Sequence, residues 1–383
     1  MRENKGGGEA RHRESAGGSV LLGSSLRDGS SVLYDPRPST STSGLLVAGE
    51  DTDDNAGIYA LLAIRIAMAR GGGVLVDTSG AVAARAREEI AEEHLEVLSP
   101  SPGEAGSLPI MDIYPEGEEK AAEVLLRGVL EGIISPHDGV SEYARILRYG
   151  IREFFELPKH RRSLDALRDN FHARSQDDHA SQSERYGASQ IALAIDYHAA
   201  SLAASVVLGR GGEQSLLGGA VSREASRFII IDLSAFGYRA GTRRENLSED
   251  EMAVSAGVLP VAAAAALRLA TSSNEPDIAG FYGADALLAS TPDIRNLLEQ
   301  HLREGRSRNT TPLIGIRGPV PPETLALIPN RLVGNYEVGR ADEGLGLLGI
   351  EPSPGRREQL ARLLPYEALF RSEDGKVEAL RVV

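Results

Sequence analysis

Residues 44–80 read GLLVAGEDTDDNAGIYALLAIRIAMARGGGVLVDTSG, and this stretch decides the fold. The apolar run Leu45–Ala48 precedes a turn rich in Gly and Asp, and the Ala- and Leu-rich residues 55–70 then predict a helix. Gly71–Gly73 stop this helix, and residues 74–77 form a second strand that ends in an aspartate. The order strand, loop, helix, strand predicts a parallel α/β sheet.

Elements on both sides of this stretch extend the α/β pattern. Ser19–Gly23 and Ser31–Asp35 flank a turn and predict a β-hairpin, whereas residues 117–207 carry apolar side chains at helical spacing and predict a helical insertion. The run Phe228–Asp232 is typical of a buried parallel strand. Further strands are expected at Leu95–Leu98, Ile278–Tyr282, Leu313–Ile316, Asn330–Tyr336 and Val377–Val382, and further helices from the capping box Ser248/Glu251 to about Thr271 and over Asp293–Glu304.

The sequence therefore predicts an α/β protein with a mostly parallel central sheet and a helical insertion. We divide the chain into a disordered tail (1–17), an N-terminal part of the α/β domain (18–116), a helical insertion subdomain (117–207) and a C-terminal part of the α/β domain (208–383).

Composition excludes several classes of protein. The 383 residues are 42% hydrophobic and 25% charged, as in ordinary globular proteins. No run approaches the roughly 18 apolar residues of a membrane span, so none is expected. The absence of cysteine excludes disulfides and thiolate metal sites and fits a reducing cytoplasm. The formal net charge of −14 repels nucleic acid, which is therefore not a favoured partner.

The ordered segments resemble the HerA–FtsK superfamily of motor ATPases, in particular the conjugative coupling and type IV secretion ATPases. Residues 44–80 resemble the family's Walker A strand, loop, helix and second strand. Residues 286–318, ALLASTPDIRNLLEQHLREGRSRNTTPLIGIRG, resemble the stretch after Walker B, with its Arg-bearing turn and sensor strand. Residues 328–350 and 363–382 resemble the closing strands. This resemblance implies a RecA-like P-loop NTPase fold from about residue 18 to the end of the chain.

The resemblance aligns Gly49 with the first glycine of G-x-x-x-x-G-K-[ST], whose backbone, Lys and hydroxyl hold the phosphates and Mg²⁺. Asp54 then stands at the second glycine, Asn55 at the lysine and Ala56 at the Ser or Thr. A phosphate would also meet the loop's four carboxylates, and repulsion between unit charges at ~4 Å costs about 4 kcal/mol at an effective dielectric of 20. We therefore predict a degenerate P-loop that binds no nucleotide, and expect no ATP–Mg²⁺ cofactor.

The Walker B position is degenerate as well. A Walker B strand ends in Asp-Glu, which hold Mg²⁺ and activate water. Alignment on the following ALLAS places Tyr282 and Gly283 at these positions, and Arg317 stands where the sensor strand usually carries Gln. Asp277 and Asp285 lie out of phase or after the strand. The resemblance therefore predicts no catalytic residue.

The Arg-bearing turn is the part of the family pattern that this sequence retains. Arg303, Arg306 and Arg308 are candidates for an inter-subunit or phosphate contact, because an arginine of a hexameric motor acts in trans on a neighbour's nucleotide. A solvated helix end is an equal alternative for these three residues.

Two metal sites are considered and set aside. Residues 51–62 begin like a calcium loop, but Ala56 replaces the glycine at position six and Leu62 the glutamate at position twelve. The histidines of the insertion, His160, His172 and His179, lack the spacing of a zinc site. No metal is expected.

We predict a catalytically inactive homologue of a conjugation or secretion motor ATPase, acting as a structural or regulatory subunit. It would form a homo-oligomer, or a hetero-oligomer with an active ATPase relative. Two alternatives stay open: an atypical ATPase that uses residues from a neighbouring subunit, and a nucleic-acid- or protein-binding adaptor. The expected location is the cytoplasm, either free or peripheral to a membrane-bound secretion or transfer complex.

Overall fold

The computed structural model of the chain describes most, but not all, of its residues. The predicted tail 1–17, the capping-box residue Ser248 and the arginine Arg306 lie outside the described residues. The described residues are 19–37, 44–50, 53–100, 108–114, 117–134, 143–199, 227–237, 251, 254–272, 277–305 and 307–383.

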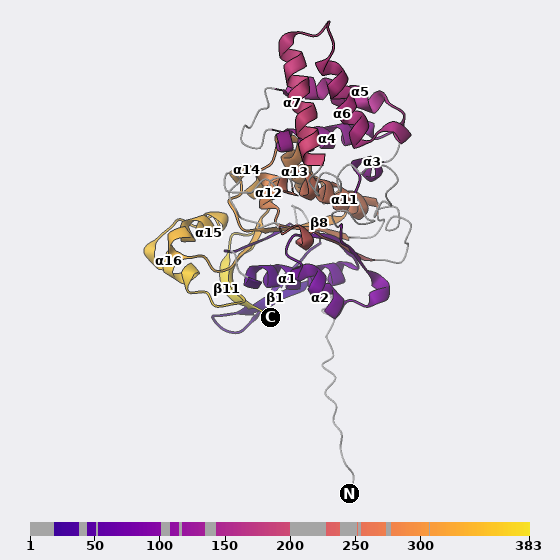
Figure 1. The fold of residues 1–383 in the computed structure, drawn as a ribbon. Helices are drawn as coiled ribbons and strands as arrows, with labels where there is room; N and C mark the ends of the chain where they lie inside the picture. The colour runs from indigo at the N-terminus through magenta and orange to yellow at the C-terminus, as the bar shows by residue number, and fades with distance from the viewer. Residues whose placement is uncertain are drawn as a thin grey trace.

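An 11-stranded sheet in the order β2-β1-β11-β10-β9-β3-β8-β7-β4-β6-β5 forms the centre of the molecule (Figure 1). The strands from β9 to β5 are parallel to one another, whereas β2, β1, β11 and β10 pair in antiparallel fashion. The bounds are β1 Val20–Ser25, β2 Ser31–Tyr34, β3 Leu45–Ala48, β4 Gly73–Asp77, β5 Leu95–Leu98, β6 Phe228–Asp232, β7 Asp277–Tyr282, β8 Thr310–Ile316, β9 Asn330–Val333, β10 Glu367–Arg371 and β11 Val377–Val382.

Helices cover both faces of the parallel part of the sheet (Figure 1). Helices α1 (Asp53–Arg70) and α2 (Ala81–Glu89) lie below it, and α11 (Leu259–Ser272), α12 (Asp285–Leu288) and α13 (Pro292–Glu304) lie above it. Strand β3 shows why its sequence is continuously apolar. Leu45 and Val47 belong to the core on the α1 side, and Leu46 and Ala48 to the core on the other side. A strand that is buried on both faces needs an apolar side chain at every position.

The insertion rises above the sheet between β5 and β6 (Figure 1). Its core is continuous with the upper layer, because residues such as Leu126, Ile151 and Ile191 belong to the same hydrophobic cluster as Leu46. The helices of this region are α3 Ile110–Ile113, α4 Glu119–Ile134, α5 Ala144–Glu156, α6 Leu164–Ser175 and α7 Gln182–Ala199. The predicted helical insertion is therefore confirmed, and its exact boundaries remain a prediction.

The C-terminal part adds helices that the sequence pattern did not predict. Helices α14 (Pro322–Leu325), α15 (Ala341–Leu347) and α16 (Pro354–Ala361) lie among the last strands, and the 3₁₀ turn η6 (Val338–Arg340) precedes α15. In the Ala-rich segment that was expected to be helical up to about Thr271, a π-helical turn, Val254–Val258, leads into α11. The predicted fold class, an α/β P-loop NTPase fold with a mostly parallel sheet and a helical insertion, agrees with this architecture.

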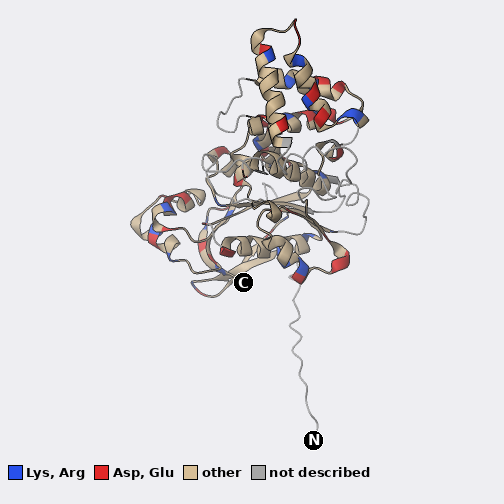
Figure 2. Ribbon diagram, viewed as in Figure 1, with Lys and Arg blue, Asp and Glu red and all other residues tan. Residues whose placement is uncertain are grey.

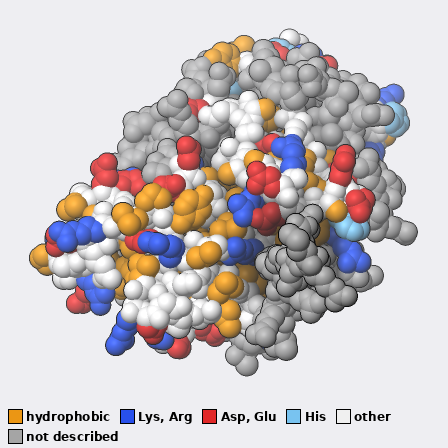
Figure 3. Space-filling view, turned by 90° about the horizontal axis from the view of Figure 1, so that it is seen from below, with side chains coloured by type: hydrophobic (Ala, Val, Ile, Leu, Met, Phe, Trp, Pro, Cys, Tyr) orange, Lys and Arg blue, Asp and Glu red, His pale blue; other side chains and the backbone are white. Residues whose placement is uncertain are grey.

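Charges of both signs are interspersed over the described surface. Lys and Arg alternate with Asp and Glu on the helices of the insertion (Figure 2). On the face seen from below, basic, acidic and apolar side chains are also mixed (Figure 3). The described side chains of the one face drawn in Figure 3 form no large basic area, which would be the electrostatic signature of nucleic-acid binding.

Candidate functional site at the P-loop position

The predicted P-loop position lies at the carboxyl edge of the parallel sheet. Strand β3 pairs with β8 and β9 so that Ala48 lies opposite Ile316 and Val333. Gly49 and Glu50 follow β3, and α1 begins at Asp53, with Asp53 and Asp54 in its first turn. In open α/β sheets, ligands bind at this edge and anions at the N-terminus of such a helix. The structure thus places the predicted loop where a phosphate-binding loop belongs in this fold.

The side chain of Asn55 turns inward at the lysine position. Asn55 is 4% exposed, and its Nδ2 donates hydrogen bonds to the backbone oxygens of Gly49 and Ile316, each over 3.4 Å. A Cβ atom added to Gly49 would lie 3.0 Å from Oδ1 of Asn55, so the amide closely packs against the start of the loop. Ala56, at the position of the Mg²⁺-binding hydroxyl, is also buried. The amide therefore ties the loop to the end of β8.

Two buried tyrosines pack between α1 and the sheet behind the loop. The ring centroids of Tyr59 and Tyr282 are 5.1 Å apart, and both residues are fully buried. A Cβ atom on Gly315 would lie 2.6 Å from the ring of Tyr282 and 2.7 Å from that of Tyr59. The glycine in the sensor strand thus provides the space for both rings. Burial raises the pKa of Tyr59 well above its usual value, so the phenol stays neutral.

The predicted Walker B position holds Tyr282 and the tight turn at Gly283. Arg317 donates a hydrogen bond from Nε to the hydroxyl of Tyr282 over 3.0 Å, and its guanidinium lies 5.4 Å from the centroid of that ring. Gly283 has φ +85°, and a Cβ there would lie 2.6 Å from Oγ1 of Thr78. The hydroxyl of Thr78 donates to the backbone oxygen of Tyr282. The end of β7 is therefore packed directly against the turn after β4.

A carboxylate that the sequence analysis set aside lies near this position. Asp285, in the first turn of α12, is 8% exposed. A Cβ atom on Gly318 would lie 3.4 Å from Cβ and 3.7 Å from Oδ2 of Asp285. Because Gly318 follows the sensor strand, Asp285 is an acid close to the carboxyl edge. Its position after β7, rather than at the end of it, is as the sequence indicated.

Glu50 links the loop to the segment after β9, a contact that the sequence analysis missed. Its Oε1 lies 2.9 Å from Nη1 of Arg340, and its Oε2 accepts a hydrogen bond from the backbone N–H of Glu337 over 2.5 Å. The backbone N–H of Glu50 donates to the oxygen of Asn335 over 3.0 Å. Arg340 also lies 5.9 Å from the ring centroid of Tyr336. No local motif signals this link, because its two sides are almost 300 residues apart in the sequence.

The aspartate that ends β4, the strand next to β7, stabilises a helix. Asp77 is fully buried, and its carboxylate accepts hydrogen bonds from the backbone of Val82 and Ala83 in α2 over 2.9 and 3.2 Å. Its other oxygen accepts from the backbone and hydroxyl of Ser79 over 2.9 and 2.7 Å. Burial raises the pKa of Asp77, with a smaller contribution from Asp232, while these donors oppose the shift. Asp77 is thus a structural acid at the base of α2.

The Arg-bearing turn lies at the opposite edge of the sheet from the P-loop. It precedes Thr310, where β8 begins, and Arg70 at the end of α1 donates to the backbone oxygen of Asn309 over 3.0 Å. The 18-residue helix α1, about 27 Å long, therefore lies between the turn and the loop. Arg303 and Arg308 pair with Glu299 and Glu304 of α13 over 2.9 and 2.6 Å, and about half of each arginine side chain is exposed.

Among the described residues, no group of three or more His, Asp or Glu side chains is arranged to hold a metal ion. No helix in the described part of the chain is long and apolar enough to cross a membrane.

The fold of this chain is found in solved structures of VirB4 and of the conjugative coupling protein TrwB. VirB4 of Thermoanaerobacter pseudethanolicus aligns with a TM-score of 0.70 at 15% identity, over 96% of this chain and 97% of that one. The bacterial conjugative coupling protein TrwB, lacking its first 70 residues, aligns with a TM-score of 0.57 at 11% identity, over 89% and 84% of the two chains. TrwB in complex with ADP and Mg²⁺ aligns with a TM-score of 0.53 at 13% identity, over 89% and 85%. No protein-family model matches the sequence, and no curated protein does.

These alignments establish the fold. The chain has the P-loop NTPase fold of VirB4 and TrwB over almost its whole length, and the resemblance inferred from residues 44–80 and 286–318 is confirmed at that level. At identities between 11% and 15%, the likeness does not extend to activity, which depends on the site and not on the fold.

Proposed function

We propose that this protein is a catalytically inactive homologue of the conjugation and secretion motor ATPases, acting as a structural or regulatory subunit of an assembly. The observation that carries the proposal is the side chain at the lysine position. Asn55 is buried and hydrogen-bonded to the backbone of the loop and of β8, where an active site needs a cation that reaches the phosphates.

Four further features of the site support this proposal. Ala56 brings no hydroxyl for Mg²⁺, and the end of β7 carries a tyrosine whose hydroxyl binds Arg317. Glu50 occupies Arg340 with its own carboxylate, so this arginine faces an anion of the chain itself. The first turn of α1 adds Asp53 and Asp54, which oppose the attraction that a helix N-terminus exerts on an anion.

Thermal unfolding with and without millimolar ATP–Mg²⁺ tests the proposal. A ligand at a hundred times its Kd stabilises a protein by about 2.7 kcal/mol, which is readily visible. We expect no saturable shift in the melting temperature, and no ATP hydrolysis above background. A saturable shift would contradict the proposal and favour an ATPase completed by a neighbouring subunit. In that case, Asp285→Asn would test whether this acid helps to hold the metal.

A matched variant shows whether the residues at the predicted P-loop position are the reason that the protein binds no nucleotide. The triple substitution Asp54→Gly, Asn55→Lys and Ala56→Thr restores the phosphate-binding pattern in a chain that otherwise keeps its fold. We expect it to gain an ATP-dependent thermal shift while hydrolysis stays absent, because Tyr282 and Gly283 still bring no acid. Full circular-dichroism and melting profiles of the variant provide the control for folding.

A structural or regulatory subunit must associate with other chains. We propose a homo-oligomer, or a hetero-oligomer with an active relative, in which Arg303, Arg306 and Arg308 face a neighbouring chain. The supporting observation is that Arg303 and Arg308 are half-exposed and remote from the P-loop of their own chain. The mass of the chain in solution, alone and mixed with an active relative, tests this. A strict monomer in both experiments would contradict the proposed role.

A further inference from the structure

Helix α7 of the insertion exposes an apolar stripe along its outer face. Tyr186, Leu193 and Tyr197 are 60%, 55% and 60% exposed. Their spacing of seven and four residues places them within about 40° of one another around the helix, whereas Ile191 and Ile195 on the opposite face are buried. We call the three exposed residues the α7 stripe. Apolar side chains aligned in this way form the kind of face that a second helix covers.

Two opposite charges flank the α7 stripe on the same side. Arg185 and Asp196 lie about 100° and 80° away from Tyr186 in the same sense around the helix, near opposite ends of the stripe. Their side chains are 40% and 43% exposed. Arg185 pairs with Asp178 over 3.7 Å, and the side chain of Asp178 is 96% exposed. Such an exposed ion pair is weak, so Arg185 can exchange this partner at little cost.

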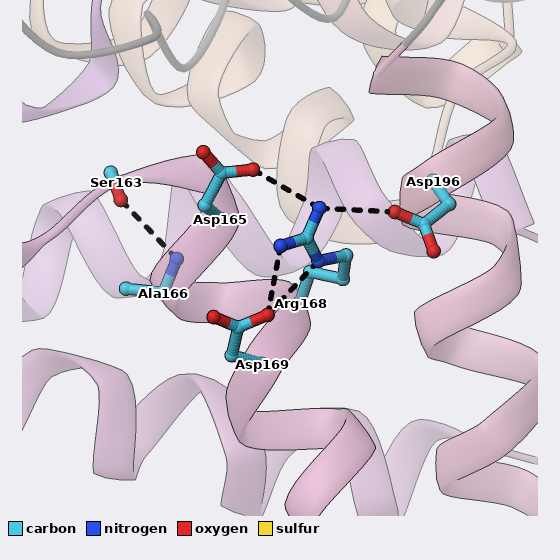
Figure 4. A network of polar contacts seen from close by, with 6 residues as sticks. All are labelled: Ser163, Asp165, Ala166, Arg168, Asp169 and Asp196. Carbon is cyan, nitrogen blue, oxygen red and sulfur yellow. Dashed lines mark hydrogen bonds and ion pairs between the residues drawn. The ribbon is translucent and has the colours of Figure 1, made fainter.

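Asp196 belongs to a network that carries excess negative charge (Figure 4). Nη1 of Arg168 lies 3.2 Å from Asp165 and 3.4 Å from Asp196, and Nη2 lies 2.9 Å from Asp169. Three carboxylates therefore share one guanidinium, and Asp196 makes the longest of the three contacts. A further cation placed beside Asp196 would be attracted to this network.

We infer that the α7 stripe is a contact with a second copy of this chain, in which the two α7 helices pack antiparallel. Two-fold symmetry then places Tyr186 of one copy beside Tyr197 of the other, and Leu193 near the centre. In an antiparallel pair related by two-fold symmetry, the flank of one helix that carries Arg185 and Asp196 faces the same flank of the other helix. The two flanks run in opposite directions. Arg185 of each copy therefore approaches Asp196 of the other, which gives two equivalent ion pairs.

The charge pattern selects this orientation over the parallel one. In a parallel two-fold pair, opposite flanks meet, and Arg185 would face the side of the helix that carries Ser183 and Ala194. Only the antiparallel arrangement brings each charge to an opposite one. The contact goes beyond the proposed function, because the insertion projects away from the sheet and its P-loop edge (Figure 1). Being two-fold, it would join two chains, or two rings, rather than build a ring.

Cysteine cross-linking tests the arrangement directly, because the chain contains no cysteine. Full-length Tyr186→Cys and Tyr197→Cys variants are treated with a short thiol cross-linker, each alone and then mixed. In the antiparallel pair, identical positions are about 16 Å apart and unlike positions adjoin, so the cross-linked dimer should form chiefly in the mixture. Efficient cross-linking of each variant alone would overturn the antiparallel arrangement. No dimer in any sample would mean that another part of the chain or another protein covers the stripe, and would overturn the inference.

Charge reversal in the full-length chain provides a second, independent measurement. By sedimentation equilibrium, Arg185→Asp and Asp196→Arg should each weaken association by about tenfold, and the double variant should restore it. Leu193→Asp should abolish this association, whereas Met68→Asp on α1, where Met68 is 51% exposed, is the matched control and should not. If the chain also forms a ring, Leu193→Asp halves the mass and leaves the ring. A double variant as weak as the single ones would overturn the inferred ion pairs.

Discussion

The polar side chains discussed above differ in burial between the two edges of the parallel sheet. At the carboxyl edge, Asn55, Asp77 and Tyr282 are buried and hydrogen-bonded to backbone or to a neighbouring side chain. At the amino edge, Arg303 and Arg308 are half-exposed and pair with acids of α13. The carboxyl edge is therefore tightly packed within this chain, whereas about half of each arginine side chain at the amino edge is exposed. Four predictions test this contrast, in order of decreasing expected effect.

Removing the tyrosine at the Walker B position should cost the most stability. Tyr282 is fully buried between α1 and the sheet, so Tyr282→Ala leaves a cavity and should lower the free energy of unfolding by about 3–5 kcal/mol. Urea denaturation measures this. Tyr149→Ala, at a residue that is 51% exposed, is the control and should change stability by less than about 1 kcal/mol. Similar losses for both would mean that the carboxyl edge is not specially packed.

At the amino edge, the buried His301 should make the protein sensitive to acid. Burial, with Arg308 nearby, lowers the pKa of His301 to about 4, from an ordinary value near 6.5. Between about pH 6.5 and pH 4, His301 is therefore protonated in the unfolded chain but neutral in the folded chain. Stability is lost as pH falls from 6.5 toward 4, by about 3 kcal/mol over the window.

The variant His301→Leu should remove this part of the pH dependence, as measured by urea unfolding at several pH values. His160→Gln, at an exposed histidine, is the matched control and should keep the slope of the original chain. An unchanged slope in His301→Leu would mean that the imidazole does not resist protonation in the folded state.

The acid at the end of β4 should contribute through its hydrogen bonds. Asp77→Ala leaves the N–H groups at the start of α2 without their acceptor and should cost about 1–3 kcal/mol. Asp77→Asn retains one acceptor oxygen and should cost less. Thermal unfolding compares the two variants. Equal losses would indicate that the charge, and not the acceptor geometry, is what α2 requires.

The smallest effect is expected for the exposed arginine of the turn. Arg303→Ala removes an ion pair with Glu299, but Glu299 still accepts a hydrogen bond from the hydroxyl of Thr324 over 2.7 Å. Because the side chain of Glu299 is only 8% exposed, losing this partner has a cost, and the free energy of unfolding should fall by about 1 kcal/mol. If the same variant weakens assembly, the arginine acts between chains. A large loss of stability in the monomer would instead assign it a role within its own fold.

Local sequence was sufficient for much of the fold and for part of the site. The apolar run Leu45–Ala48 and the glycines after α1 predicted the central strand–loop–helix–strand unit, because buried strands and helix ends leave signals within a few residues. The residues at the lysine and hydroxyl positions, Asn55 and Ala56, could be read in the same way. Helices α15 and α16 were not predicted, because short helices rich in Gly, Pro and charge have weak local signals.

Local sequence patterns were enough to predict the chain's α/β character and its helical insertion, and they name the residues, Asn55 and Ala56, at the predicted P-loop position. The contacts of these residues depend on the tertiary fold. The link from Glu50 to Arg340 and the packing of Tyr59 against Tyr282 join segments far apart in the chain, so no local pattern contains them. The exposure of the α7 stripe was decided in the same way, because the buried face of a helix depends on the helices that pack against it.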